Sequence, residues 1–291
     1  MAEKQPLKFA YYPGCSLESA LAKEFDESAR RTAEHLGCEM DELHDWNCCG
    51  ASSGHSTSRM LNHAIVGRNL ALAEQQGLDI AAACPACYIR LKHTRQSVSE
   101  DAELKKQVID TIGMPYQGTY DVRHLLDIIV NDIGLEAVRE KVVKPLTGLK
   151  LVSYYGCFLV RPPSVTSFDD PENPVTMDNL LETIGADVRD WTGKVDCCGG
   201  SLSLTKRDVV TGLVRDIIDQ ARDAGAEALV AACPLCNMNI DGRQSLSGNI
   251  LPVFYFTELM GLAMGLSGTG KWWKKHIVSP VNLLKKHRLI P

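Results

Sequence analysis

The chain has 291 residues, of which 45% are hydrophobic and 23% are charged, and this composition is typical of a globular protein with about two domains. Its formal net charge of −5 excludes a strongly basic nucleic-acid-binding protein. The longest apolar stretch, residues 251–266, contains Glu258 and is shorter than the roughly 20 residues of a membrane span. We therefore expect no transmembrane segment and a cytoplasmic protein, in which thiols stay reduced.

Strands and helices are expected to alternate along the first half of the chain. The apolar run 7–12 predicts a buried strand that ends at a Gly-Cys pair, and a helix is expected at residues 18–36. A short strand then leads to a Cys-Cys-Gly motif, and another helix follows. The strand expected at 78–83 ends at a Cys-Pro-x-Cys motif, in which Pro85 suits the first turn of a helix. Helical extensions are expected at residues 101–113 and 121–134.

The second half repeats this order. Its predicted elements are strands at 149–155, 228–232 and 251–256 and helices at 175–184, 207–222 and 257–266. The alternation indicates right-handed βαβ units and parallel sheets. We therefore predict an α/β protein with two tandem, pseudo-symmetric Rossmann-like domains at residues 1–147 and 148–291, the second of which includes a basic C-terminal tail.

Cysteine is unusually frequent, with 11 residues, and ten of them form two matched sets of five. The spacing is Cys-x32-Cys-Cys-x34-Cys-x2-Cys in the first half and Cys-x39-Cys-Cys-x34-Cys-x2-Cys in the second. The two sets are Cys15, Cys48, Cys49, Cys84 and Cys87, and Cys157, Cys197, Cys198, Cys233 and Cys236. The motifs follow predicted strands, and ligands bind at the carboxyl ends of strands in parallel sheets. The eleventh cysteine, Cys38, aligns with Ala186, so we expect it to be a small buried side chain.

Three kinds of chemistry use closely spaced thiols. Structural zinc takes four ligands, so one thiol of each set would be idle. A thioredoxin-like active site needs only the Cys-x-x-Cys motif and leaves the other three thiols without a role. Iron–sulfur clusters are held by thiolates, usually four to a [4Fe–4S] cluster, and a cluster with an extra thiolate fits the count of five best. Glycines that flank the motifs let backbone N–H groups approach sulfur: Gly14, Gly50, Gly156 and Gly199.

This cysteine pattern, in two complete copies between residues 7 and 266, resembles the CCG-domain signature of the B subunit of heterodisulfide reductase and its relatives. The resemblance implies two non-cubane [4Fe–4S] clusters, each held by the five cysteines of one repeat, which face one cavity between the domains. It implies an oxidoreductase component that reduces, or reversibly forms, a disulfide or related sulfur substrate between the clusters. The implied partners are a ferredoxin-type protein similar to the C subunit of that enzyme, which delivers electrons singly, and a flavoprotein similar to its A subunit.

Two other functions remain open at this point. One is an electron-transfer subunit that passes electrons to a quinone or flavin partner without binding a disulfide. The other is a scaffold held together by zinc. In methanogen members of the family a histidine often follows the cysteine equivalent to Cys157, whereas this chain has Phe158, so the resemblance does not identify the substrate.

Reduction of a disulfide to thiols consumes protons. His44, His55 and Tyr154 lie near cysteine motifs and are the candidate proton donors. The tail, residues 271–291, contains six Lys or Arg residues and fits contact with an acidic partner, contact with a membrane surface, or a partly packed tail with solvated lysines. We expect Trp272 and Trp273 to be buried.

Overall fold

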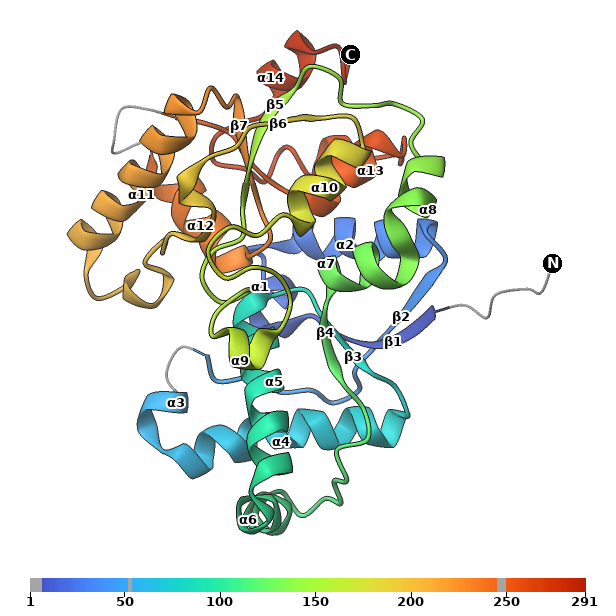
Figure 1. The fold of residues 1–291 in the computed structure, drawn as a ribbon, viewed down its shortest axis with the longest axis vertical. Coiled ribbons are helices and arrows are strands. Elements are labelled where there is room, and N and C mark those ends of the chain that lie inside the picture. The colour runs from blue at the N-terminus through green and yellow to red at the C-terminus, as the bar shows by residue number, and fades with distance from the viewer. Residues whose placement is uncertain (1–6, 52–53, 245–249) are drawn as a thin grey trace, which may run out of the picture.

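The computed structural model describes residues 7–51, 54–244 and 250–291, and these form an α/β protein around two four-stranded parallel sheets (Figure 1). The strands of the first sheet are β1 (Leu7–Tyr12), β2 (Cys38–Glu42), β3 (Ile80–Ala82) and β4 (Val122–His124). Those of the second are β5 (Lys150–Tyr154), β6 (Asp187–Val188), β7 (Ala228–Ala231) and β8 (Val253–Tyr255). The predicted α/β class with parallel sheets is confirmed.

The two sheets have the same strand order, β2-β1-β3-β4 in the first half and β6-β5-β7-β8 in the second. Every pair of neighbouring strands is parallel. All residues of the central strands β3 and β7 are buried, because helices cover both faces of a parallel sheet. The equal order is the structural counterpart of the sequence repeat.

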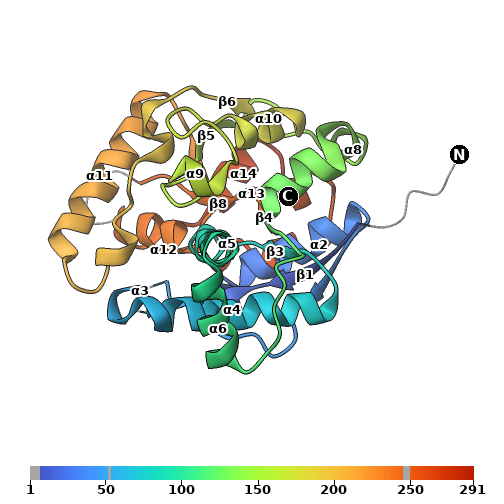
Figure 2. The ribbon, with the colours of Figure 1, turned by 60° about the horizontal axis from the view of Figure 1, so that its bottom comes forward.

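Helices connect the strands. Those of the first half are α1 (Gly14–Glu18), α2 (Lys23–His35), α3 (Gly54–Thr57), α4 (Arg59–Gln76), α5 (Pro85–Glu100), α6 (Ala102–Ile112), α7 (Leu125–Asp127) and α8 (Leu135–Glu140). Those of the second are α9 (Pro163–Thr166), α10 (Thr176–Thr183), α11 (Arg207–Asp223), α12 (Pro234–Arg243), α13 (Phe256–Ala263) and α14 (Val281–Lys286). Figures 1 and 2 both place α3, α4 and α6 toward the bottom of the view, with α10 above them.

One predicted element was wrong in its first part. Residues 121–134 were expected to be helical, but they begin with strand β4, whose residues 122–124 pair with 80–82 of β3. The strand is only three residues long and contains Arg123, so the sequence carries no apolar run that would mark it. The helical part begins at Leu125 and continues as a wider helical turn over Ile128–Gly134.

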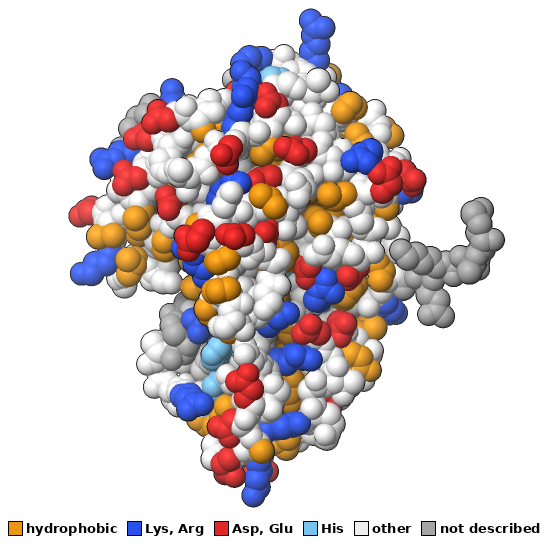
Figure 3. Space-filling model, viewed as in Figure 1, with side chains coloured by type: hydrophobic (Ala, Val, Ile, Leu, Met, Phe, Trp, Pro, Cys, Tyr) orange, Lys and Arg blue, Asp and Glu red, His pale blue; other side chains and the backbone are white. Residues whose placement is uncertain are grey.

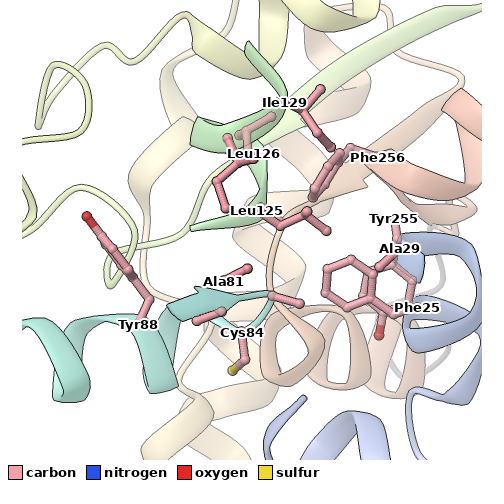
Figure 4. Close-up of a cluster of buried hydrophobic side chains, with 14 of the residues drawn as sticks. Phe25, Ala29, Ala81, Cys84, Tyr88, Leu125, Leu126, Ile129, Tyr255 and Phe256 are labelled. Atoms are coloured by element: carbon pink, nitrogen blue, oxygen red, sulfur yellow. The ribbon is translucent and has the colours of Figure 1, made fainter. Parts of the chain in front are cut away.

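The two halves share one hydrophobic core. Helix α2 of the first half packs against α13 of the second. Phe25 of α2 stacks on Tyr255, with ring centroids 4.3 Å apart and ring planes within 4° of parallel. The hydroxyls of Ser28 and Thr257 form a buried hydrogen bond of 2.7 Å. Figure 4 shows Phe25 and Tyr255 near Leu125, and Phe256 next to Ile129, so side chains from both halves fill the same space.

One loop of the second half packs against the first half. This segment, residues 161–174, contains α9, and α9 contacts α5 of the first half. The hydroxyl of Tyr88, on α5, donates a 2.8 Å hydrogen bond to the carbonyl of Thr166. The ring of Phe168 lies 6.4 Å from that of His124 in an edge-to-face contact. Residues 161–174 therefore contact α5, the helix that begins at the Cys-Pro-x-Cys motif of the first half.

The basic tail packs against the rest of the chain. Trp272 and Trp273 are 1% and 2% exposed, which confirms the predicted burial. The Arg31 guanidinium lies over the Trp272 ring at 5.6 Å, and His276 forms a buried 2.9 Å hydrogen bond with Glu258. The lysines of the tail are exposed, and acidic and basic side chains are interspersed over the face shown in Figure 3. Each helix in the described ranges is too short or too polar to cross a lipid bilayer.

Candidate metal centre

Both sets of cysteines gather at the carboxyl-terminal end of a sheet. Cys15 follows β1 within α1, and Cys84 follows β3 and immediately precedes α5. Cys157 and Cys233 take the equivalent places after β5 and β7. Each Cys-Cys pair lies in the loop that leaves the neighbouring edge strand, β2 or β6. The chain therefore brings thiols that are tens of residues apart to one end of each sheet.

The sulfur atoms are close enough to share metal atoms. In the first half, Cys49 Sγ lies 3.3 Å from Cys87 Sγ, and Cys48 Sγ lies 4.0 Å from Cys15 Sγ. In the second half, the Sγ atoms of Cys198 and Cys236, the counterparts of Cys49 and Cys87, are also 3.3 Å apart. All eleven cysteines are free thiols. The two sets therefore have matching geometry.

A backbone N–H group donates a hydrogen bond to one exposed thiol of each set. The N–H of Gly50 donates to Cys48 Sγ and that of Gly199 to Cys197 Sγ, each at 3.4 Å. A hydrogen bond from Cys15 and this N–H lower the pKa of Cys48, and Cys157 with the Gly199 N–H lower that of Cys197. Thiolate, rather than thiol, is the form that binds metal.

The two sets meet in the interior. The thiols of Cys84 and Cys233 interact with each other, and this interaction, with one to Cys87, holds the pKa of Cys84 well below its usual value. Cys84 is 2% exposed and Cys233 is 4% exposed. Each is the last residue before a helix, α5 or α12. These two residues are 149 positions apart in the sequence, and the packing of the two halves alone brings them together.

Glycines leave room for sulfur at equivalent points of the two halves. Gly14 and Gly156 directly precede Cys15 and Cys157 and have positive φ angles of 69° and 66°. A Cβ atom at Gly14 would lie 2.8 Å from Cys87 Sγ, and one at Gly156 would lie 3.1 Å from Cys236 Sγ. Both contacts are closer than ordinary van der Waals distance, so these positions require glycine.

These observations test whether the residues fit an iron–sulfur group. Two thiolates on one tetrahedral metal, at about 2.3 Å each, lie about 3.8 Å apart, and the observed separations of 3.3 and 4.0 Å lie on either side of this value. Among the described residues, no group of three or more His, Cys, Asp or Glu side chains is arranged to hold a single metal ion. A cluster has several metal atoms, so its ligands are distributed in pairs rather than around one point. The donor set, all thiol and flanked by backbone N–H groups, fits a cluster.

Part of each set reaches the surface beside a pocket. Cys15, Cys48 and Cys197 are exposed and Cys157 is half-buried, whereas the other six cysteines are buried. A pocket of about 590 Å³ has Cys48 in its wall, together with Asn47, Ala64, Ile65, Arg68, Thr111 and Ile112. A second pocket, of about 440 Å³, is lined by Cys157, Phe158, Arg161, Pro162, Pro163, Pro171 and Glu172. Small molecules in either pocket would lie against a thiol of one set.

The three candidate proton donors differ in their surroundings. His44 is exposed, and the side chain of His55 lies outside the described residues. Tyr154 is fully buried, and its hydroxyl donates a 2.5 Å hydrogen bond to the Asp196 carbonyl. Burial and the thiols of Cys236 and Cys198 raise the pKa of Tyr154 well above its usual value, so its hydroxyl retains the proton. A donor role for these residues stays a prediction.

Tyr12, the counterpart of Tyr154, was not among the predicted site residues. Its hydroxyl donates a 2.7 Å hydrogen bond to the Asn47 carbonyl, just before the Cys48-Cys49 pair, as Tyr154 does before the second Cys-Cys pair. Burial and four cysteine thiols raise its pKa. The signal was present in the aligned repeats, which both have tyrosine three residues before the first cysteine of the set.

Cys38 lies apart from both sets. It is 2% exposed at the start of β2, and burial raises its pKa to about 11 with contributions from Asp132 and Glu39 but from no other cysteine. The residue after Cys38 pairs with Lys8 of β1, and the residue after Ala186 pairs with Lys150 of β5. The strand register therefore confirms the sequence alignment of Cys38 with Ala186.

Comparison with known proteins identifies the family. The family model described as a cysteine-rich domain, CCG, matches residues 9–92 and 151–241, so each half carries one copy. The chain belongs to the CCG cysteine-rich domain family. The matched ranges contain all ten cysteines of the two sets.

Two relatives cover nearly the whole chain. One is the 8-methylmenaquinol:fumarate reductase membrane anchor subunit of Wolinella succinogenes, 32% identical over 89% of this chain and 93% of its own length. The other is the B subunit of the ferredoxin:CoB-CoM heterodisulfide reductase of Methanosarcina mazei, 27% identical over 96% of each chain. CCG domains in such relatives imply iron–sulfur clusters and an oxidoreductase complex of several subunits.

The fold is also found in a solved structure. A hypothetical protein from Helicobacter pylori matches with a TM-score of 0.70 at 15% identity, over 94% of this chain and 52% of the other. This chain thus spans about half of that protein. At this identity the match supports the α/β architecture alone.

Proposed function

We propose that this chain is the component of an oxidoreductase complex in which two non-cubane [4Fe–4S] clusters together reduce, or reversibly form, a disulfide or related sulfur bond. The ligands are the two sets of five cysteines, with one cluster assigned to residues 1–147 and the other to residues 148–291. The contact between Cys84 and Cys233 carries the proposal, because it makes the two thiol sets neighbours in the protein interior.

The arrangement suits a two-electron reaction. Bound iron–sulfur clusters supply one-electron transfer. A disulfide needs two electrons, so two adjacent one-electron sites complete its reduction without releasing a half-reduced sulfur radical. The chain's own part is to hold the two sites together: the 4.3 Å stack of Phe25 on Tyr255 and the Ser28–Thr257 hydrogen bond join the halves beside Cys84 and Cys233.

The exposed thiols and the buried ones have different tasks in this proposal. The buried set (Cys49, Cys84, Cys87, Cys198, Cys233 and Cys236) keeps water away from the centre. The pocket beside Cys157 gives a sulfur substrate access from solvent, and its Arg161 guanidinium, 2.8 Å from the exposed Glu172 carboxylate, can exchange that partner for an anionic substrate group. We expect electrons to arrive from a ferredoxin-type partner, itself served by a flavoprotein, in the cytoplasm.

A second candidate is electron transfer to a quinone or flavin without a disulfide. The 32% identical relative is named as part of an 8-methylmenaquinol:fumarate reductase. The pocket beside Cys48 favours this candidate as well, because Ala64, Ile65 and Ile112 give it an apolar wall that suits a quinone ring.

The first test measures iron, acid-labile sulfide and zinc in the full chain after anaerobic purification. About four iron atoms per half are expected. The chain is then reduced with dithionite, freed of excess reductant and mixed with a heterodisulfide or with a water-soluble menaquinone analogue, while cluster absorbance is followed.

The outcomes separate the candidates. Rapid reoxidation by disulfides and not by the quinone supports the proposed function, and the opposite pattern supports the quinone candidate. Zinc in place of iron would reject both. The matched control is the Arg161→Gln variant, which should slow reoxidation by anionic disulfides but not by neutral ones.

A further inference from the structure

One difference between the surroundings of the two thiol sets lies on the helix that begins at each Cys-Pro-x-Cys motif. Arg90 on α5 comes three residues after Cys87, and Asn239 on α12 comes three residues after Cys236. Residues three apart on a helix lie on the same face. Arg90 and Asn239 are also 149 positions apart, which is the repeat offset of the Cys-x-x-Cys motifs. The repeat therefore has a cation at the position where its second copy has a neutral amide.

In the second half, Asn239 is held against a thiol. It is 1% exposed, and its Nδ2 atom donates to the Cys198 carbonyl at 3.1 Å and lies 3.8 Å from Cys198 Sγ. Its Oδ1 atom accepts hydrogen bonds from Ser203 Oγ at 2.6 Å and from Arg243 Nε at 3.3 Å. The amide group is thus fixed with its N–H side toward sulfur.

In the first half, Arg90 has no such partners. Its Nε atom is buried and lacks a hydrogen-bond partner. Burial lowers the pKa of Arg90, and the one charged group that raises it is the thiol of Cys49, the counterpart of Cys198. Arg90 is half-buried as a residue, and its buried Nε atom lacks a partner, so a negative charge on the nearby thiols is favourable to it.

The second half also contains a nearby cation, and its position differs. Arg243 follows Asn239 by one helical turn, so the asparagine stands between it and the thiol. Its guanidinium also donates a 2.7 Å hydrogen bond to the Ser203 carbonyl. Because Coulomb energy falls with distance and Asn239 lies between Arg243 and Cys198, we expect Arg243 to act on its thiol set more weakly than Arg90 acts on its own.

We propose that Arg90 makes the cluster of the first half easier to reduce than that of the second, so that the first half is the site that accepts the first electron. This inference rests on the proposed function only in requiring a cluster at each thiol set. One-electron reduction adds one negative charge to a cluster and forms or breaks no bond. A cation beside Cys49 stabilises that added charge, and net charge and hydrogen bonds to sulfur are known to set cluster potentials. The 3.3 Å spacing is the same for Cys49–Cys87 and Cys198–Cys236, so this spacing does not distinguish the two clusters.

The experiment is a redox titration of the full chain with dithionite and mediators, followed by EPR spectroscopy. The wild type should give two reduction waves, and loss of the higher-potential wave in Cys49→Ala identifies the first-half cluster. At a fixed potential, Arg90→Gln should lower the ratio of reduced to oxidised first-half cluster at least tenfold, which is about 59 mV for one electron. Arg90→Lys keeps the charge and should change this ratio less than threefold. Asn239→Ala is the matched variant and should shift only the other wave.

The results that would overturn the inference are distinct from those that would overturn the proposed function. Two waves that stay in place in Arg90→Gln would reject the inference alone. Loss of iron from Arg90→Gln and from Arg90→Lys would also reject it, because Arg90 would then hold the cluster in place rather than set its potential. A wild-type chain without iron would reject the proposed function and the inference together.

Discussion

Replacement of Gly14 by alanine tests whether glycine is needed at this position to leave room for the sulfur atom of Cys87. The added Cβ atom would lie 2.8 Å from Cys87 Sγ, so the sulfur must move by about 0.6 Å to reach ordinary contact at 3.4 Å. Metal–ligand distances tolerate deviations of about 0.2 Å. The shift is therefore too large for Cys87 to keep its place in a cluster. We expect Gly14→Ala to lose roughly half of the wild-type iron, because only the first-half site is affected.

Alanine substitutions at two other glycines separate the steric effect on the sulfur atom from the cost of the positive φ angle. Gly113 has nearly the same φ, 66°, and nothing lies within 4 Å of a Cβ built there. Gly113→Ala should therefore show only the left-handed backbone cost of about 1–2 kcal/mol and keep all its iron. Gly156→Ala, at 3.1 Å from Cys236 Sγ, requires a shift of about 0.3 Å and should give an intermediate loss.

The assay combines iron content per chain, after anaerobic reconstitution, with urea unfolding of the same samples. The backbone cost should be similar in all three variants, so stability and iron content should separate. Equal iron content in Gly14→Ala and Gly113→Ala would refute the argument that glycine is needed here to admit sulfur.

Three further outcomes are expected. Cys49→Ala should lose the first-half cluster while Cys38→Ala keeps both, as iron analysis would reveal, and equal iron in the two would contradict the ligand assignment. Burial lowers the pKa of His276 but Glu258 more than offsets this and raises it to about 9, so the pair contributes about 3 kcal/mol that is fully present below about pH 6.5 and lost as the pH rises through 9. In urea melts His276→Gln should abolish that alkaline decline, and an unchanged decline would count against the pair as its source. Trp272→Ala should cost about 3–5 kcal/mol in the same melts, and a loss under 1 kcal/mol would contradict its burial as a stabilising contact.

Much of the fold could be predicted because its signals are local. The apolar run at residues 7–12 became strand β1, and residues 207–223 form helix α11 close to the predicted range. Strand β4 was missed because three residues that include Arg123 show no apolar run, and only their pairing with β3 makes them a strand. Short edge elements depend on tertiary hydrogen bonds rather than on sequence pattern.

Part of the candidate site could also be predicted from the sequence, and part depends on tertiary contacts. Repeat alignment assigned the ten cysteines to two sets and set Cys38 aside through Ala186, and the strand register agrees with that alignment. Tyr12 and Arg90 were visible in the same alignment, but their meaning depends on what their side chains face. The hydroxyl of Tyr12 bonds the Asn47 carbonyl, and Arg90 has Cys49 as its charged neighbour.

The sequence by itself determined that there are two copies of one α/β unit, each with five thiols in motifs that follow strands, because hydrophobic pattern and motif spacing act over short distances along the chain. Only the tertiary structure decided that Cys84 and Cys233 meet, that residues 161–174 cover the first half, and that one thiol set faces a cation and the other an amide. These relations join residues far apart in the sequence. They are fixed by the packing of α2 against α13 in one shared core, which leaves no local mark on the chain.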